Sequence, residues 1–238
     1  MANFPFQRLQ KDLADLIART PAGQRLPSEP ELAKQLGVSR ATLREAMRSF
    51  ETQGMIRRRQ GSGTFVVGKI QALDSGLEVL ESLETMAKRL GLEVTMSDLS
   101  IEEIKADAEF SSALSLPMDT KLTLVRRVIR AEARPVAYLV DVLPENILHS
   151  KDIPFDFHGS VLDFLLGRGD SLTTSRANVS AIGATAEVAK ALEIQRGDVL
   201  LHFYSQLFDS SGKVVDYSLS YFIPGYFHFH VVRRVGSG

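Results

Sequence analysis

The stretch LGVSRATLREAM, residues 36–47, decides the fold of the amino-terminal part of the chain, because it predicts a helix with two unlike faces. Arginines recur every four residues, and a helix gathers residues at that interval into one exposed stripe: Arg40, Arg44 and Arg48. Apolar residues follow the i, i+3, i+4, i+7 spacing of a buried face: Leu43, Ala46, Met47 and Phe50. Such a helix is either an ordinary solvated surface helix or one that presents its arginines to an anion.

The residues before this helix predict a second, shorter helix and a tight turn. Ser28, followed three residues later by Glu31, forms a capping box that satisfies free amides at a helix start. Gly37 suits the left-handed conformation that ends many helices, and Ser39 is a good cap for the next helix. Two short helices joined by a glycine-containing turn are typical of a helix-turn-helix.

The flanking segments complete this unit. Residues 6–18 carry leucine and isoleucine at helical spacing, which predicts a helix ahead of the pair. Residues 55–67, MIRRRQGSGTFVV, predict two short strands around a glycine-rich turn, with arginine at positions 57 to 59. Three helices followed by a basic hairpin make a winged helix-turn-helix, whose second helix of the pair enters the DNA major groove.

The distribution of charge favours the anion-facing interpretation. Residues 1–70 contain 12 Lys and Arg against 6 Asp and Glu, whereas the remaining residues contain 16 against 23. This split indicates that one segment meets a polyanion and the other does not. Cysteine is absent, which excludes disulfides and thiolate metal sites and fits the cytoplasm, where we expect the protein. No apolar run approaches the length of a membrane-spanning helix.

The stretch LPSEPELAKQLGVSRATLREAMRSFETQGMIRRRQGSGTFVV resembles the DNA-binding domain of GntR-family bacterial transcription regulators. The resemblance implies double-stranded operator DNA as a partner, with base or phosphate contacts from the recognition helix and the wing. The DNA-binding residues expected on this basis are Ser28, Ser39, Arg40, Thr42, Arg44, Arg58, Gln60 and Gly61. Pro30 stands where the family commonly has an arginine, so one common DNA contact is missing and the operator sequence cannot be transferred from relatives.

The rest of the chain predicts a second domain. We expect a winged helix-turn-helix domain over residues 1–68, a linker over 69–76, and an effector-binding and dimerisation domain over 77–238. A helix is predicted at 77–90, strands at 95–104, 122–131, 135–142, 173–181, 199–208, 214–222 and 227–232, and helices at 106–114, 161–166 and 186–192. Because strands follow one another through hairpins more often than through helices, we predict an α+β fold with a mainly antiparallel sheet.

This second part resembles the UTRA-type effector domain of the HutC-like branch of the same family. The resemblance is carried by LSLPMDTKLTLVRRVIRAEARPVAYLVDVLP, GSVLDFLL and ALEIQRGDVLLHFYSQLFDSSGKVVDYSLSYF. It implies a chorismate-lyase-like sheet with a pocket for a small metabolite. The effector-binding residues expected are Arg127, Tyr138, Ser160, Asp216 and Tyr221.

Departures from the family pattern bear on the effector. Members that bind sugar phosphates commonly carry polar residues where this chain has Ile129, Leu139 and Leu162. Because a doubly charged phosphate generally needs several donors together, we expect a partly apolar effector that is not a sugar phosphate, with at most one anionic end near Arg127. The alternative is that each of these positions is an ordinary sheet residue without a ligand.

The leading hypothesis is a homodimeric regulator, predicted to be a repressor, whose affinity for a near-palindromic operator is set by a small metabolite. The alternatives are a DNA-binding protein whose second domain only dimerises, and an enzyme with lyase-like chemistry. We expect no catalytic site, since Asp156, His158 and Ser160 alternate along one loop and cannot form a catalytic chain. We also expect no metal and no cofactor, because His228 and His230 lack further ligands.

Overall fold

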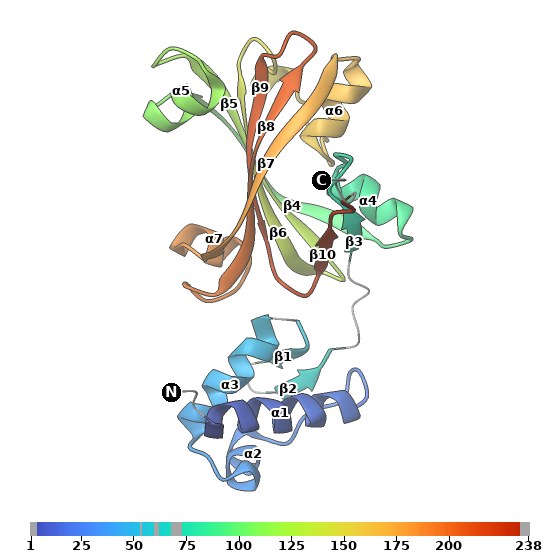
Figure 1. Ribbon diagram of the computed structural model, residues 1–238, viewed down its shortest axis with the longest axis vertical. Helices are drawn as coiled ribbons and strands as arrows, with labels where there is room; N and C mark the ends of the chain where they lie inside the picture. Colours follow the sequence, from blue (N-terminus) through green and yellow to red (C-terminus); the bar gives the residue numbers. More distant parts are fainter. Residues whose placement is uncertain (1–3, 53, 60–61, 68–72, 234–238) are drawn as a thin grey trace, which may run out of the picture. The chain divides into compact units, whose positions relative to one another are not determined.

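The computed structural model describes residues 4–52, 54–59, 62–67 and 73–233, which form two compact units (Figure 1). The first unit contains α1 (Phe4–Arg19), α2 (Glu29–Leu36), α3 (Arg40–Thr52), β1 (Ile56–Arg59) and β2 (Gly63–Val66). The strands β1 and β2 pair in antiparallel fashion, so the predicted order of three helices and a hairpin is confirmed. No helix in the described ranges is long and apolar enough to cross a membrane.

The amphipathic pattern of the first unit explains its packing. The apolar face predicted for α3 is buried, and one core joins it to α1, α2 and both strands: Leu9, Leu13, Ile17, Leu26, Leu32, Ala33, Leu43, Ala46, Met47, Phe50, Ile56 and Val66. Gly37 ends α2 with φ of 66°, the left-handed conformation that the sequence predicts at this turn. The helix pair is therefore fixed on one side, which leaves the opposite side of α3 at the surface.

The second unit is built on a six-stranded antiparallel sheet with the order β4-β5-β6-β9-β8-β7. The strands are β4 (Val94–Lys105), β5 (Lys121–Ala131), β6 (Arg134–Pro144), β7 (Leu172–Gly183), β8 (Val199–Asp209) and β9 (Val214–Phe222). The helices are α4 (Leu83–Arg89), α5 (Ala108–Leu114), α6 (Val161–Arg168) and α7 (Ala186–Ala191), with a short 3₁₀ helix at Ser150–Asp152. The predicted mainly antiparallel α+β fold is confirmed.

Helices cover the two faces of this sheet. Figure 1 shows α4 and α6 on one face and α5 and α7 on the other. The face toward α6 buries a cluster that includes Val125, Leu143, Val161, Leu165 and Leu207. Because neighbouring residues of a strand point to opposite faces, each strand contributes alternate residues to two separate environments.

A two-stranded ribbon lies beside the α4 face and corrects two expectations from the sequence. β3 (Leu73–Gly76) pairs in parallel with β10 (Phe227–His230), so the last four residues of the predicted linker form a strand. The predicted helix over 77–90 begins only at Leu83, since Ser82 caps it by accepting the Thr85 N–H. The residues before Ser82 lead out of β3 instead, and Leu80 is 51% exposed rather than buried.

Candidate functional site

The surface of α3 carries the first candidate site. Arg40 and Arg44 are exposed, whereas Leu43, between them, is fully buried. The arginine side of α3 is thus available to a ligand, and guanidinium groups are the side chains best suited to phosphates and guanine edges.

An ion-pair network orients two of the predicted DNA-binding arginines. Arg44 Nε lies 2.6 Å from the carboxylate of Glu29, the first residue of α2. Arg58 Nε lies 3.4 Å from the carboxylate of Glu51, and Arg58 Nη2 donates to the carbonyl oxygen of Arg44 at 3.2 Å. The wing strand β1, α2 and α3 therefore hold these cations in one place, which lowers the ordering cost of meeting a ligand.

The predicted hydroxyl donors lie at helix starts. The carboxylate of Glu31 accepts hydrogen bonds from the amide and the hydroxyl of Ser28, which lowers the pKa of Glu31. Ser39 Oγ accepts the Thr42 N–H at 3.1 Å, and the hydroxyls of Ser39 and Thr42 are hydrogen-bonded to each other. Ser39 and Thr42 are exposed and Ser28 is half-buried, and all three lie at the amino-terminal ends of α2 and α3, a suitable setting for phosphate. The predicted contacts Gln60 and Gly61 lie outside the described residues.

The second candidate site is a group of buried and half-buried charged residues, here called the Arg127 cluster: Glu84, Arg127, Asp141, Asp163 and Asp216. Arg127 of β5 is 4% exposed and forms an ion pair with Asp141 of β6. Asp216 of β9 is 6% exposed, and burial followed by the charge of Asp141 raises its pKa well above the usual value. The register of β5, β6 and β9 places the side chains of Arg127, Asp141 and Asp216 on one face of the sheet. This is the face that α4 and α6 cover.

Several polar atoms of the Arg127 cluster have no partner. Both carboxylate oxygens of Glu84, Oδ1 of Asp216 and Nε of Arg127 are buried without a hydrogen bond to any described residue. Burial raises the pKa of Glu84, and the charge of Arg127 opposes this rise. Buried polar atoms are almost always paired in folded proteins, so a concentration of unpaired ones marks a functional site.

Serines at two helix starts border the cluster. Ser82 Oγ donates to Asp163 Oδ2 at 2.5 Å, and Thr85 Oγ1 donates to the same oxygen at 3.2 Å. Ser160 Oγ accepts the Asp163 N–H at 3.2 Å and thereby caps α6. Ser160 is 3% exposed, so its role in the structure is that of a helix cap beside the cluster.

The other two predicted effector residues lie on the opposite face of the sheet. Tyr138 pairs with Tyr221, which pairs with His202, and their rings form one row. The hydroxyl of Tyr138 donates to Glu187 of α7 at 2.9 Å, and burial, followed by this hydrogen bond, raises the pKa of Tyr138. The five predicted residues therefore do not line one pocket, because the sheet separates Arg127, Ser160 and Asp216 from the two tyrosines.

The sequence predicts Arg127 and Asp216 of this cluster but not its other carboxylates, Glu84, Asp141 and Asp163. Asp141 and Asp216 each interrupt an apolar strand, in LVDVL and VVDYS, and a lone acid in such a run is a signal for a buried charge. Glu84 lacked such a signal, because it lies in a helix of mixed composition.

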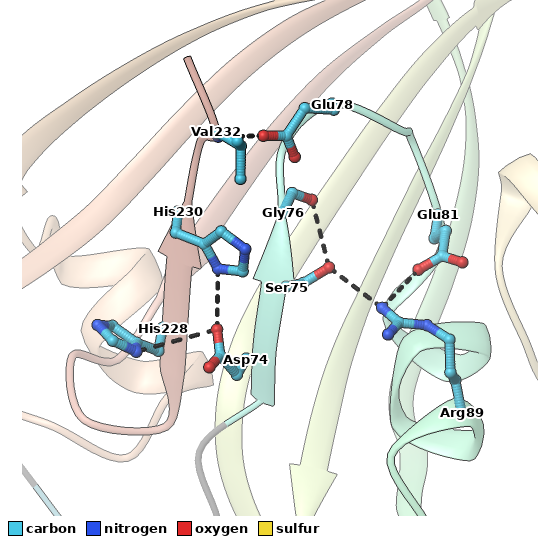
Figure 2. Close-up of polar contacts among 9 residues, drawn as sticks. All are labelled: Asp74, Ser75, Gly76, Glu78, Glu81, Arg89, His228, His230 and Val232. Carbon is cyan, nitrogen blue, oxygen red and sulfur yellow. Dashed lines mark hydrogen bonds and ion pairs between the residues drawn. The ribbon is translucent and has the colours of Figure 1, made fainter. Parts of the chain in front are cut away.

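The two histidines for which the sequence predicts no metal lie on the ribbon. Figure 2 shows His228 and His230 on β10 beside Asp74 of β3, with Nδ1 of each ring 3.9 Å and 2.9 Å from one Asp74 oxygen. Their contact is with a carboxylate on the paired strand. This arrangement fastens the ribbon.

A further group of possible metal ligands occurs in the part of the chain that the structure describes: Glu103, Glu145 and His149. The Lys151 N–H donates to Nδ1 of His149 at 3.1 Å, which places the ring proton of the neutral form on Nε2. Nε2 lies 3.3 Å from Glu145, so in this arrangement it donates to that carboxylate.

Comparison with known proteins agrees with this geometry. Residues 6–66 match the model for bacterial regulatory proteins of the gntR family, and residues 89–228 match the UTRA domain. The chain belongs to the GntR family of transcription regulators and carries a UTRA domain. The UTRA match alone takes in more than half of the chain.

Relatives of this GntR-family regulator include named repressors. The chain is 27% identical to the probable fructoselysine utilization operon transcriptional repressor of Escherichia coli, covering 89% of this chain and 86% of the relative. It is 27% identical to the transcriptional repressor NagR of Bacillus subtilis, covering 82% and 79%. The crystal structure of PhnF from Mycobacterium smegmatis shares the fold, with a TM-score of 0.65 and 20% identity over 96% of this chain and all of the other.

Proposed function

We propose that this regulator is a ligand-responsive repressor, which binds a near-palindromic operator as a homodimer and changes its affinity when a small metabolite binds the UTRA domain. The names of its relatives support repression, since two of them are described as transcriptional repressors. One winged helix reads a single half-site, so a dimer is needed for tight, specific binding.

The Arg127 cluster is the observation that carries the effector part of this proposal. Burying charges without full pairing destabilises a fold, and an apolar interior of equal volume is often more stable. A domain that served only to dimerise therefore has no use for Glu84, Arg127 and Asp216 in its interior. A ligand that forms hydrogen bonds or ion pairs with these buried atoms accounts for their presence.

The test begins with selection of a binding sequence from random duplex DNA by the full-length protein. Fluorescence anisotropy with the selected duplex then measures operator affinity with and without small molecules, and transcription in vitro from a promoter that overlaps the site distinguishes repression from activation. We expect fewer transcripts with the protein alone and their recovery with the effector. If the transcript level rises with protein alone, the protein is an activator and the proposed repression is wrong.

A further inference from the structure

We infer that the ligand of the UTRA domain carries a positively charged amine or guanidinium group, which the carboxylates of the Arg127 cluster bind. This inference rests on the proposed function, since it names the chemical class of the effector.

The charge balance of the cluster is negative. Arg127 is the cation that acts on both Glu84 and Asp216, yet it is already paired with Asp141. Asp163 adds a further carboxylate, which acts on Glu84 from the start of α6. One guanidinium group therefore interacts with three carboxyl groups, Asp163 adds a fourth to the cluster, and an additional cation would relieve the repulsion among them.

The unpaired atoms are mostly acceptors. Glu84 offers two buried oxygens and Asp216 one, against a single unpaired donor, Nε of Arg127. An ammonium group brings three N–H donors and a guanidinium group five, whereas a carboxylate or phosphate ligand brings acceptors only. Because Asp216 is 6% exposed, its free oxygen points into the protein interior rather than to solvent. The cluster is therefore complementary to a cationic donor.

The pairing of Arg127 changes the expectation drawn from the sequence. The sequence predicts an anionic end of the ligand beside Arg127. In the structure Asp141 occupies that role, and an anion placed beside Arg127 would also approach Glu84 and Asp216. Like charges at such short range in a buried site repel strongly, so an anionic ligand is disfavoured.

In the free protein, protonation relieves the same repulsion. The pKa values of Glu84 and Asp216 are raised, so these carboxyl groups hold protons more readily than exposed ones. A cation that binds between them favours their ionised forms. Binding is therefore expected to release protons and to tighten as the pH rises, which an apolar or anionic ligand would not do.

Isothermal titration of the full-length protein tests the inference. The cationic probes are putrescine and agmatine, and the anionic probes are succinate and glucose 6-phosphate. We expect saturable binding of a cationic probe, with proton release seen as a dependence of the heat on the ionisation enthalpy of the buffer. Glu84→Gln and Asp216→Asn should each weaken this binding about tenfold or more. Glu109→Gln, a matched change on α5 at the opposite face, should leave it unaltered.

The outcomes separate this inference from the proposed function. Tighter binding of succinate or glucose 6-phosphate, or the absence of saturable binding by both cations, overturns the assignment of a cationic ligand. If an anion binds and alters operator affinity, the assignment of a cationic ligand is wrong and the proposed regulatory function holds. A cation that binds in a Glu84-dependent way without altering operator affinity supports the cationic site and counts against the proposed function.

Discussion

Arg89 of α4 and Ser75 of β3 are joined by a hydrogen bond, with Nη2 of the arginine 3.4 Å from the serine hydroxyl (Figure 2). The same guanidinium group lies 2.9 Å from Glu81. α4 carries Glu84 of the Arg127 cluster, and β3 is the first strand after the predicted DNA-binding domain. A ligand that moves α4 therefore acts directly on the strand that leads from the DNA-binding part of the chain.

Arg89→Ala is expected to weaken the coupling between effector and operator by roughly 0.5–2 kcal/mol, because it removes the contacts that join α4 to β3. Effector affinity in the absence of DNA should change little. The measurement is the ratio of effector affinities with and without operator, since coupling is reciprocal. Arg196→Ala removes an exposed arginine from a turn beyond α7 and serves as control. If Arg89→Ala and Arg196→Ala show equal coupling, the contact between α4 and β3 does not transmit the effector signal.

Arg40→Ala and Arg44→Ala should each weaken operator binding by about 1–3 kcal/mol if the guanidinium group contacts a guanine edge. If the arginine instead contacts a phosphate, its removal should reduce the slope of log affinity against log salt concentration by about one. Arg19→Ala removes the same charge from the last turn of α1, which is not part of the arginine stripe, and serves as the control for the loss of one positive charge. Anisotropy across a salt series measures both quantities. If Arg40→Ala and Arg44→Ala lose no more operator affinity than Arg19→Ala, the expected contact of α3 with DNA is wrong.

Arg127→Ala should destabilise the UTRA domain by about 3–5 kcal/mol, because it leaves Asp141 and Asp216 buried without their cation. Arg126→Ala, one residue earlier, removes a partly exposed arginine that pairs with Glu102 and should cost about 1 kcal/mol or less. Urea unfolding followed by circular dichroism gives both values. If Arg127→Ala lowers the free energy of unfolding no more than Arg126→Ala does, the buried ion pair of Arg127 with Asp141 is not needed for the fold.

Asp216 is expected to make stability depend on pH in a defined direction. Its pKa is raised in the folded state, so its stabilising contribution is full below the unfolded pKa of about 3.9 and is lost as the pH rises through the folded value. Asp216→Asn should therefore be more stable than the wild type at about pH 8, with a smaller difference at about pH 5. Unfolding curves at several pH values measure this. A difference that grows as the pH falls has the wrong sign for a raised pKa.

The edge strand β7 is expected to take part in dimerisation. β7 has 12 residues at one edge of the sheet, Arg176 is the charged residue in its sequence, and Val179 is 49% exposed. Edge strands of monomers are usually protected by charges or proline, so an edge with little protection suits pairing with a second copy. Val179→Lys should raise the dimer dissociation constant about tenfold or more.

Sedimentation equilibrium across a concentration series tests this interface. Met118→Lys is a matched control, since Met118 is 55% exposed outside the strands. If Val179→Lys dimerises as tightly as Met118→Lys, the interface lies elsewhere on the molecule.

Local sequence patterns were sufficient for most of the fold. The spacing of Leu43, Ala46, Met47 and Phe50 predicts the buried face of α3, and Gly37 predicts the turn before it, because both depend on residues within one or two turns of helix. β3 could not be predicted in this way. Its sequence, LDSG, has little preference for a strand, and it exists through pairing with β10 at the far end of the chain.

The candidate effector site was only partly predictable for a similar reason. Arg127 and Asp216 were identified and do lie together, but Tyr138 and Tyr221 were grouped with them although they lie on the opposite face. Which residues of two strands share a face depends on the register between the strands, and the register follows from packing across the whole sheet. Glu84 joins the cluster from a separate helix, so nothing near it in the sequence indicates its partner.

The parallel pairing of β3 with β10 also has a practical consequence for protein engineering. It places the first and last strands of the second unit side by side and in the same direction, so Leu73 at the start of β3 pairs with Phe227 at the start of β10. A module closed in this manner can be joined to a different partner through its entry strand without rethreading its sheet. Leu73 is therefore the position at which we expect a different amino-terminal segment to be joinable to this unit.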